Sequence, residues 1–179
     1  MEGKEELKVS DNSKKEGGRE RDERIRKLEE LREMGVNPYP YRFERTHTLA
    51  EAAENEEALS AENSSASFAG RIMAVRGHGH TSFGNLKDGT GSLQFYIKDA
   101  EVDEKTWKTF RLLDIGDIVG ITGSLFRTRT GELTIKVSGL ELLSKSLLPL
   151  PEKYHGLQDK ELRYRRRYVD LIVNDDVME

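Results

Sequence analysis

Two hairpin turns and one helix-like segment divide residues 66–145 into five strand-like segments, an order that few folds accommodate. The first turn contains the pair Asp88-Gly89, and Asp-Gly supplies the positive-φ residues of a tight hairpin. The second turn spans residues 129–131. Apolar residues at helical spacing predict a helix over residues 101–113. The segments with strand character are 67–76, 82–88, 92–98, 117–128 and 132–143.

The resulting order, βββαββ, predicts an all-β core built as an OB-fold, a five-stranded Greek-key barrel. The second and third strands of such a barrel face single-stranded ligands. Gly70, Gly120 and Gly123 suit the sharp coiling that so small a barrel needs. We expect helices before the barrel and a linker helix after it.

Composition separates the barrel from the rest of the chain. Hydrophobic and charged residues each make up 35% of the sequence, so part of the chain is expected to stay outside any core. Residues 1–18 contain few large apolar groups and are predicted to be a disordered tail. Residues 19–65 form an N-terminal helical segment, whose shorter helix opens with the capping box Thr48–Glu51. Residues 146–179 begin as a proline-bounded linker and then become helical.

Charge and cysteine content exclude several classes of function. The net charge of −4 gives no global basic field, so any contact with nucleic acid must be local. The sequence has no cysteine, which excludes disulfides, thiolate zinc sites and thiol catalysis and fits a cytoplasmic location. No segment approaches the roughly 18 apolar residues of a membrane span, and no membrane contact is expected. His78 and His80 lack a third ligand nearby in sequence, so no metal site is predicted.

Residues around the first hairpin suggest a site for an unstacked base. Phe83 offers a ring for stacking, while Arg76 and Gln94 offer polar groups that could reach a base edge. Gln94 lies between Leu93 and Phe95, and strand alternation therefore turns it away from those apolar groups. Taken alone, Phe83 is more typical of a residue in the barrel core, and Glu132 of a surface charge.

The motifs then show a family resemblance. The segments AGRIMAVRGHGHTSF, LKDGTGSLQFYIK, TGELTI and PLPEKYHGLQDKELRYRRRYVDLI resemble the N-terminal region of class II lysyl-tRNA synthetases. The resemblance runs from about Arg24 to the end of the chain. It implies that the barrel binds the uridine-rich anticodon loop of tRNA(Lys). The resemblance also implies four anticodon contacts. Phe83 corresponds to the family's stacking aromatic, and Arg76 and Gln94 to its base-reading arginine and glutamine. Glu132 corresponds to its anticodon-contacting glutamate.

Other residues are candidates for the RNA backbone. His80 stands where the family commonly has a lysine, and the imidazole is the weaker phosphate partner. Arg163 and Arg166 belong to a basic cluster that is consistent either with a solvated helix face or with phosphate contact.

The resemblance also implies what the full-length enzyme does. It attaches lysine to tRNA(Lys) with ATP and Mg²⁺, and it is expected to be a cytoplasmic homodimer. The class II motifs that carry this reaction would lie beyond Glu179, in a catalytic domain missing here. This chain alone is therefore expected to bind tRNA, to hold no cofactor and to lack catalytic residues. Two alternatives stay open: a stand-alone OB-fold module for single-stranded nucleic acid, and a protein-interaction fragment.

Overall fold

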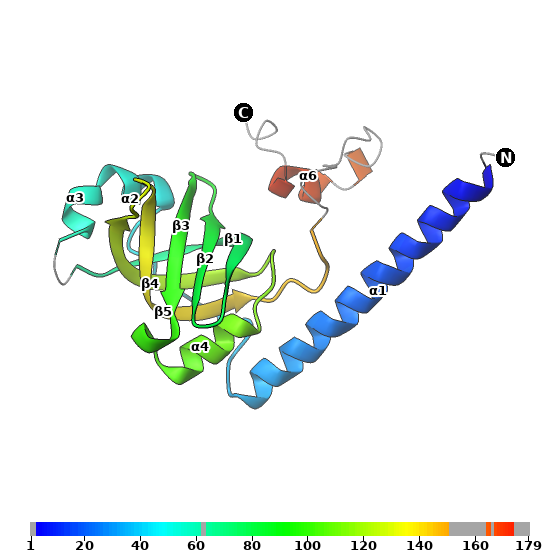
Figure 1. Ribbon diagram of the computed structural model, residues 1–179, viewed down its shortest axis with the longest axis horizontal. Coiled ribbons are helices and arrows are strands. Elements are labelled where there is room, and N and C mark those ends of the chain that lie inside the picture. Colours follow the sequence, from blue (N-terminus) through cyan, green and yellow to red (C-terminus); the bar gives the residue numbers. More distant parts are fainter. Residues whose placement is uncertain (1–2, 62–63, 151–163, 166, 174–179) are drawn as a thin grey trace.

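Five strands form a closed barrel in the computed structural model, which describes residues 3–61, 64–150, 164–165 and 167–173. Around the barrel the strand order is β1-β2-β3-β5-β4 (Figure 1). Every neighbouring pair is antiparallel except β3 and β5, which run parallel. The strands are β1 (Ala66–His78), β2 (Thr81–Lys87), β3 (Ser92–Lys98), β4 (Ile118–Arg127) and β5 (Leu133–Ser144).

A single helical insertion separates the third and fourth strands. It consists of the 3-10 turn η1 (Asp99–Glu101) and helix α4 (Glu104–Arg111). Asp103 caps α4, because its carboxylate accepts a hydrogen bond of 2.9 Å from the backbone N–H of Thr106. Phe110 of α4 packs edge-on against Phe95 of β3, with ring centroids 6.3 Å apart. The predicted βββαββ order and OB-fold barrel are thereby confirmed.

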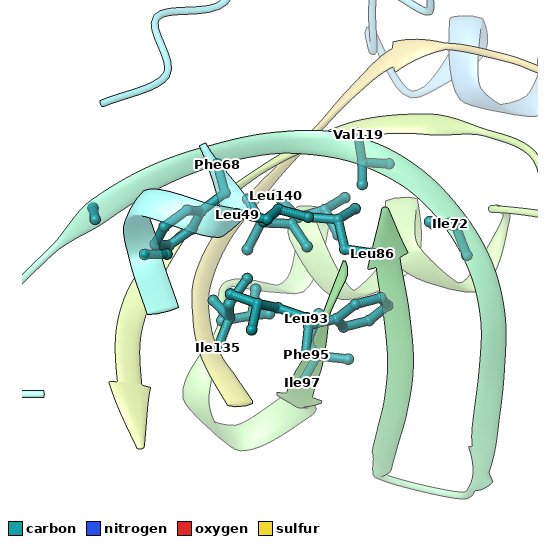
Figure 2. Close-up of a cluster of buried hydrophobic side chains, with 14 of the residues drawn as sticks. Leu49, Phe68, Ile72, Leu86, Leu93, Phe95, Ile97, Val119, Ile135 and Leu140 are labelled. Atoms are coloured by element: carbon teal, nitrogen blue, oxygen red, sulfur yellow. The ribbon is translucent and has the colours of Figure 1, made fainter. Parts of the chain in front are cut away.

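Strand alternation places one set of side chains inside the barrel. Along β2 and β3, buried residues alternate with partly exposed ones, so Leu93 and Phe95 point inward. Figure 2 shows these side chains gathered with Ile72, Leu86 and others at the centre of the barrel. Each large apolar side chain that is buried contributes about 1.5–3 kcal/mol to folding. Gly84 leaves room for Phe95, since a Cβ there would lie 2.2 Å from the ring.

The long N-terminal helix differs from the expectation for residues 1–18. α1 is one helix from Gly3 to Glu33, whereas the sequence predicted a disordered tail followed by a helix from residue 19. The predicted disorder is therefore wrong for residues 3–18. Lysine and glutamate have high helix propensity and recur through residues 4–16, which favours helix there. Figure 1 shows α1 running away from the barrel toward the N-terminus.

The C-terminal part of α1 is docked on the barrel by both apolar and charged contacts. Leu28 and Leu31 are buried. Arg24 donates to the backbone carbonyls of Ile115 and Ser146, at 3.1 and 3.0 Å. Gly35, with a φ of +69°, follows the end of α1 in the left-handed conformation that glycine adopts readily.

Two short helices follow where the sequence predicted one. α2 (Leu49–Glu54) and α3 (Glu56–Leu59) are separated at Asn55, whose φ of −100° and ψ of 24° interrupt the helix. The predicted capping box between Thr48 and Glu51 is confirmed at the start of α2. A hydrogen bond connects the start of α2 to the β2–β3 turn: the carboxylate of Asp88 accepts from the N–H of Leu49 at 3.0 Å.

The last described helix is α6 (Arg167–Val173). Leu171 and Ile172 line a cavity of about 300 Å³ together with Ala69 and Met73 of β1.

Candidate nucleic-acid interface

The outer face of the barrel carries the residues that the sequence singled out. Arg76 of β1 pairs with Phe83 of β2, and Phe83 pairs with Tyr96 of β3. Gln94 lies two residues before Tyr96 and therefore on the same face of β3. Its neighbours Leu93 and Phe95 are buried, which confirms the predicted alternation.

All four predicted anticodon-binding residues line one open cavity of about 460 Å³. This volume falls within the range of small-ligand sites, about 300–1,000 Å³. The β4–β5 hairpin forms the opposite wall with Thr128, Arg129 and Thr130, three residues that sequence reasoning missed. The sequence marked this hairpin as a turn, but only the parallel pairing of β3 with β5 brings it to the cavity. The full lining is Arg76, Phe83, Gln94, Thr128, Arg129, Thr130 and Glu132.

Hydrogen bonds on both sides fix the amide of Gln94. Its Nε2 donates to Glu132 Oε2 at 2.8 Å, and its Oε1 accepts from the hydroxyl of Thr134 at 3.0 Å. Thr134 is fully buried, so its position is well constrained. The amide and the carboxylate are thus oriented before any ligand arrives, and Glu132 keeps further acceptor capacity on its two oxygens.

Helix α3, which lies outside the barrel, holds the β4–β5 hairpin through Arg127. Arg127 donates from Nε and Nη2 to the two carboxylate oxygens of Glu56 in α3, at 2.7 and 2.6 Å. It also donates from Nη1 to the carbonyl of Gly131 at 2.6 Å. The hydrogen bond with Glu56 raises the pKa of Arg127. A two-pronged bond of this kind fixes direction as well as distance, so α3 helps to hold the hairpin in place.

Phe83 belongs to the outer surface, whereas other phenylalanines fill the core. Phe68 and Phe95 have no exposed area, while Phe83 is partly exposed. Its ring contacts Tyr96 with centroids 5.0 Å apart and an interplanar angle of 54°. Tyr96 in turn contacts Phe126, with centroids 6.0 Å apart at 76°. A ring that lines an open cavity in this way can offer a face to a base.

Two cations of the cavity are available to a ligand. Arg76 and Arg129 are exposed, and neither makes a hydrogen bond or ion pair with any residue that the structure describes. Guanidinium groups bind phosphates and base edges through directed hydrogen bonds. With Glu132 as the carboxylate of the lining, the cavity carries local positive charge on a chain of net charge −4.

Of the three residues predicted to contact the RNA backbone, the structure describes His80. His80 does not line the cavity; its imidazole bonds the carboxylate of Asp99 and holds the pKa of Asp99 below its usual value. Arg163 and Arg166 lie outside the described residues. Within the described part of the chain, no group of three or more metal-ligating side chains could hold a metal ion. None of the described helices is both long and apolar enough to cross a membrane.

Comparisons with known proteins agree with this geometry. Residues 66–143 match the family model tRNA_anti-codon, described as an OB-fold nucleic acid binding domain. The lysine--tRNA ligase of Carboxydothermus hydrogenoformans is 53% identical over 156 residues, which cover 87% of this chain and 32% of the relative. The corresponding enzyme of Thermotoga maritima is 48% identical over 164 residues, 89% of this chain and 33% of the relative.

The chain thus spans about a third of the length of the curated relatives it matches. The identity nevertheless extends well beyond the barrel, because 87% of the chain aligns with the first of these enzymes. Residues 66–143 therefore match a family model for an OB-fold nucleic acid binding domain, in a chain that is similar to the N-terminal region of lysyl-tRNA synthetases.

Proposed function

We propose that this chain binds the anticodon loop of tRNA(Lys) and that the cavity on the barrel holds one uridine of the anticodon. The observation that carries the proposal is the convergence of Arg76, Phe83, Gln94 and Glu132 on one open cavity. An aromatic ring, an oriented amide, a carboxylate and a guanidinium with no partner among the described residues together supply stacking, hydrogen bonding and charge for one nucleotide.

Discrimination between bases would depend on Glu132. Uridine carries a hydrogen at N3, which a carboxylate can accept, whereas cytosine presents a bare N3 acceptor that a carboxylate repels. Because Gln94 Nε2 already holds Glu132 Oε2, the carboxylate is oriented before binding. A mismatch that leaves buried polar groups unpaired makes such discrimination large.

The reaction of the whole enzyme is a wider proposal. The relatives are named lysine--tRNA ligases, and we infer that a full-length protein would attach lysine to tRNA(Lys) with ATP and Mg²⁺, as a homodimer in the cytoplasm. We assign no residue of this chain to ATP, lysine or magnesium. We therefore expect the purified chain to bind RNA without lysine-dependent exchange between ATP and pyrophosphate, and measurable exchange would contradict that assignment.

A titration separates this function from its alternatives. The purified chain is titrated at one fixed salt concentration with a lysine anticodon stem-loop and with a stem-loop whose uridines are replaced by cytosines. We expect clearly tighter binding to the uridine loop. Equal binding to both would favour a stand-alone single-strand module, and binding to neither would favour a protein-interaction fragment.

A further inference from the structure

The outer face of the barrel continues past the cavity as one row of paired residues. Strand register places Arg76 opposite Phe83, Phe83 opposite Tyr96, and Tyr96 opposite Lys136 of β5. The row therefore reads cation, ring, ring, cation across four neighbouring strands. Neighbouring strands lie about 4.8 Å apart, so the row is about 14 Å long. One nucleotide stacked in a strand advances only about 3.4 Å, which makes the row longer than one base requires.

The far half of this row lies outside the cavity. Tyr96 and Lys136 do not line it, although Arg76 and Phe83 do. Tyr96 is partly exposed, and its hydroxyl makes no hydrogen bond within the described residues. Phe126 packs its ring against that of Tyr96 at 76°, an edge-to-face contact that supports Tyr96 from the side.

Lys136 is the cation at the far end. Its side chain is 50% exposed, and its ion-pair partner is Glu101 of η1, at 3.2 Å. An exposed pair of this type contributes little to folding and is readily exchanged for another partner. A phosphate could thus replace the carboxylate of Glu101 beside Lys136.

We propose that Tyr96 and Lys136 form a second nucleotide position, which takes the base and the phosphate of a nucleotide next to the one stacked on Phe83. The inference rests on the proposed function, because it needs a single strand already held in the cavity. Tyr96 would stack on the second base, and Lys136 would pair with its phosphate. Stacking is tolerant of base identity, so this position adds affinity without adding discrimination.

A competing explanation is that Tyr96 merely covers the barrel. Leucine at position 96 would still pack apolar atoms against Phe83 and Phe126, but it would offer no aromatic face. Tyr96→Leu therefore tests stacking with less disturbance of the neighbours than alanine would cause. The melting temperature of the variant checks that the barrel is intact.

The test pairs protein variants with RNA loops that carry an abasic nucleotide at one position at a time. We expect Tyr96→Leu to weaken binding of the intact lysine anticodon stem-loop at least about fivefold, the lower end of the effect of one stacked base. Tyr96→Leu should bind one of the abasic loops as tightly as the wild type does, because that loop lacks the base that stacks on Tyr96. Phe83→Leu should match the wild type on a different abasic loop, whose missing base is next to the base that stacks on Tyr96.

The outcomes separate this inference from the proposed function. If Tyr96→Leu binds as tightly as the wild type, or if both variants couple to the same nucleotide, no second position exists. If the wild-type chain does not prefer the uridine loop, the proposed function itself fails, whatever Tyr96 does.

The role of Lys136 can be tested independently through the salt dependence of RNA binding. Lys136→Ala should flatten the dependence of log Kd on log salt by about one phosphate contact. The matched control is Lys108→Ala on α4, which removes an exposed lysine paired with Glu104 at 2.7 Å and should leave the salt dependence unchanged. Glu101→Gln should tighten binding, since it removes the carboxylate that competes for Lys136. An unchanged slope in Lys136→Ala would overturn the phosphate contact.

Discussion

At the scale of single residues, the bond between Gln94 and Glu132 links two groups that could read one base. Gln94 is held at Nε2 by Glu132 and at Oε1 by Thr134, so turning its amide over would set its carbonyl oxygen against the carboxylate of Glu132. An oriented amide costs less ordering when RNA binds, which raises affinity and selectivity together. The carboxylate, in contrast, can exchange the Gln94 donor for a donor on the base.

We predict that Glu132→Gln narrows the preference for uridine over cytosine by about 1–2 kcal/mol, the scale of one buried hydrogen bond. Glutamine can turn its NH₂ group toward the bare N3 of cytosine, whereas its carbonyl oxygen still accepts from uridine. Titrations with cytosine at each anticodon position in turn measure the change. Glu141→Gln removes the same charge from an exposed site on β5 and serves as the control. A preference that survives unchanged at every position would remove Glu132 from base reading.

Phe83 gives a second prediction at this scale. Phe83→Ala should weaken binding of the lysine stem-loop by about 1–3 kcal/mol, the usual worth of one stacked base. Its melting temperature should change little, because Phe83 lies on the outer face. Phe95→Ala is the contrasting control: Phe95 is fully buried, and its truncation should cost about 3–5 kcal/mol of stability. Unfolding of the Phe83 variant would contradict its place on the surface.

At the scale of elements, the β4–β5 hairpin joins the binding face through a brace from a helix distant in sequence. Glu56 of α3 holds Arg127, and Arg127 holds the carbonyl of Gly131. The hairpin itself is tightened by the bond from the N–H of Glu132 to the hydroxyl of Thr128, at 3.1 Å. A wall fixed before binding does not have to be ordered by the ligand.

Glu56→Gln should therefore weaken binding of the stem-loop by about two- to fivefold, the range of a single exposed ion pair. The melting temperature should stay near that of the wild type. Faster amide exchange at Gly131 would report the loosened hairpin directly. Glu57→Gln, one residue further along α3 and exposed, provides a control with the same change of charge. Equal affinities for both variants would mean that the brace does not shape the site.

How much of this could be predicted depends on the range of the interactions. The order of strands and helix along the chain, the capping box and the outward position of Gln94 depend on residues that are neighbours in sequence. Each of these features was predictable. The parallel pairing of β3 with β5 joins residues about 40 positions apart, and no local pattern places Thr128, Arg129 and Thr130 beside Phe83. The hydrogen bond between His80 and Asp99 also joins residues far apart in sequence. The break at Asn55 depends on the backbone angles of one residue, which the sequence pattern does not specify.

At the scale of the whole molecule, buried charges join α1 to the point where the chain leaves the barrel. Lys145 has a fully buried side chain and donates to Asp114 and Asp117, at 2.5 and 2.7 Å. Lys27 of α1 donates to the other oxygen of Asp114 at 2.6 Å. The backbone N–H of Ser146 donates to Asp117. A single network therefore fixes the helix and the exit segment together. Sequence alone gives little reason to expect a lysine in this position, since lysines are almost never fully buried unless paired.

This network makes stability depend on pH. Burial raises the pKa of Asp114, but hydrogen bonds from Lys145 and Lys27 outweigh burial and leave the pKa below its ordinary value. A carboxyl whose pKa is lowered on folding stabilises the protein above its unfolded pKa, about 3.9, and loses that contribution as the pH falls toward the folded value. Stability that depends on Asp114 should thus be complete at neutral pH and decline below about pH 4.

The corresponding variant is Asp114→Asn, which keeps the shape of the side chain but removes its charge. We predict that the variant unfolds at lower denaturant concentration than the wild type at pH 7, because Lys145 and Lys27 lose a charged partner. The difference between the two proteins should shrink as the pH falls below about 4, where the wild-type carboxyl takes up its proton. Asp22→Asn on the exposed part of α1 should unfold like the wild type at both pH values. A gap between wild type and Asp114→Asn that stays constant from pH 7 to pH 3 would show that the charge of Asp114 does not hold α1 to the barrel.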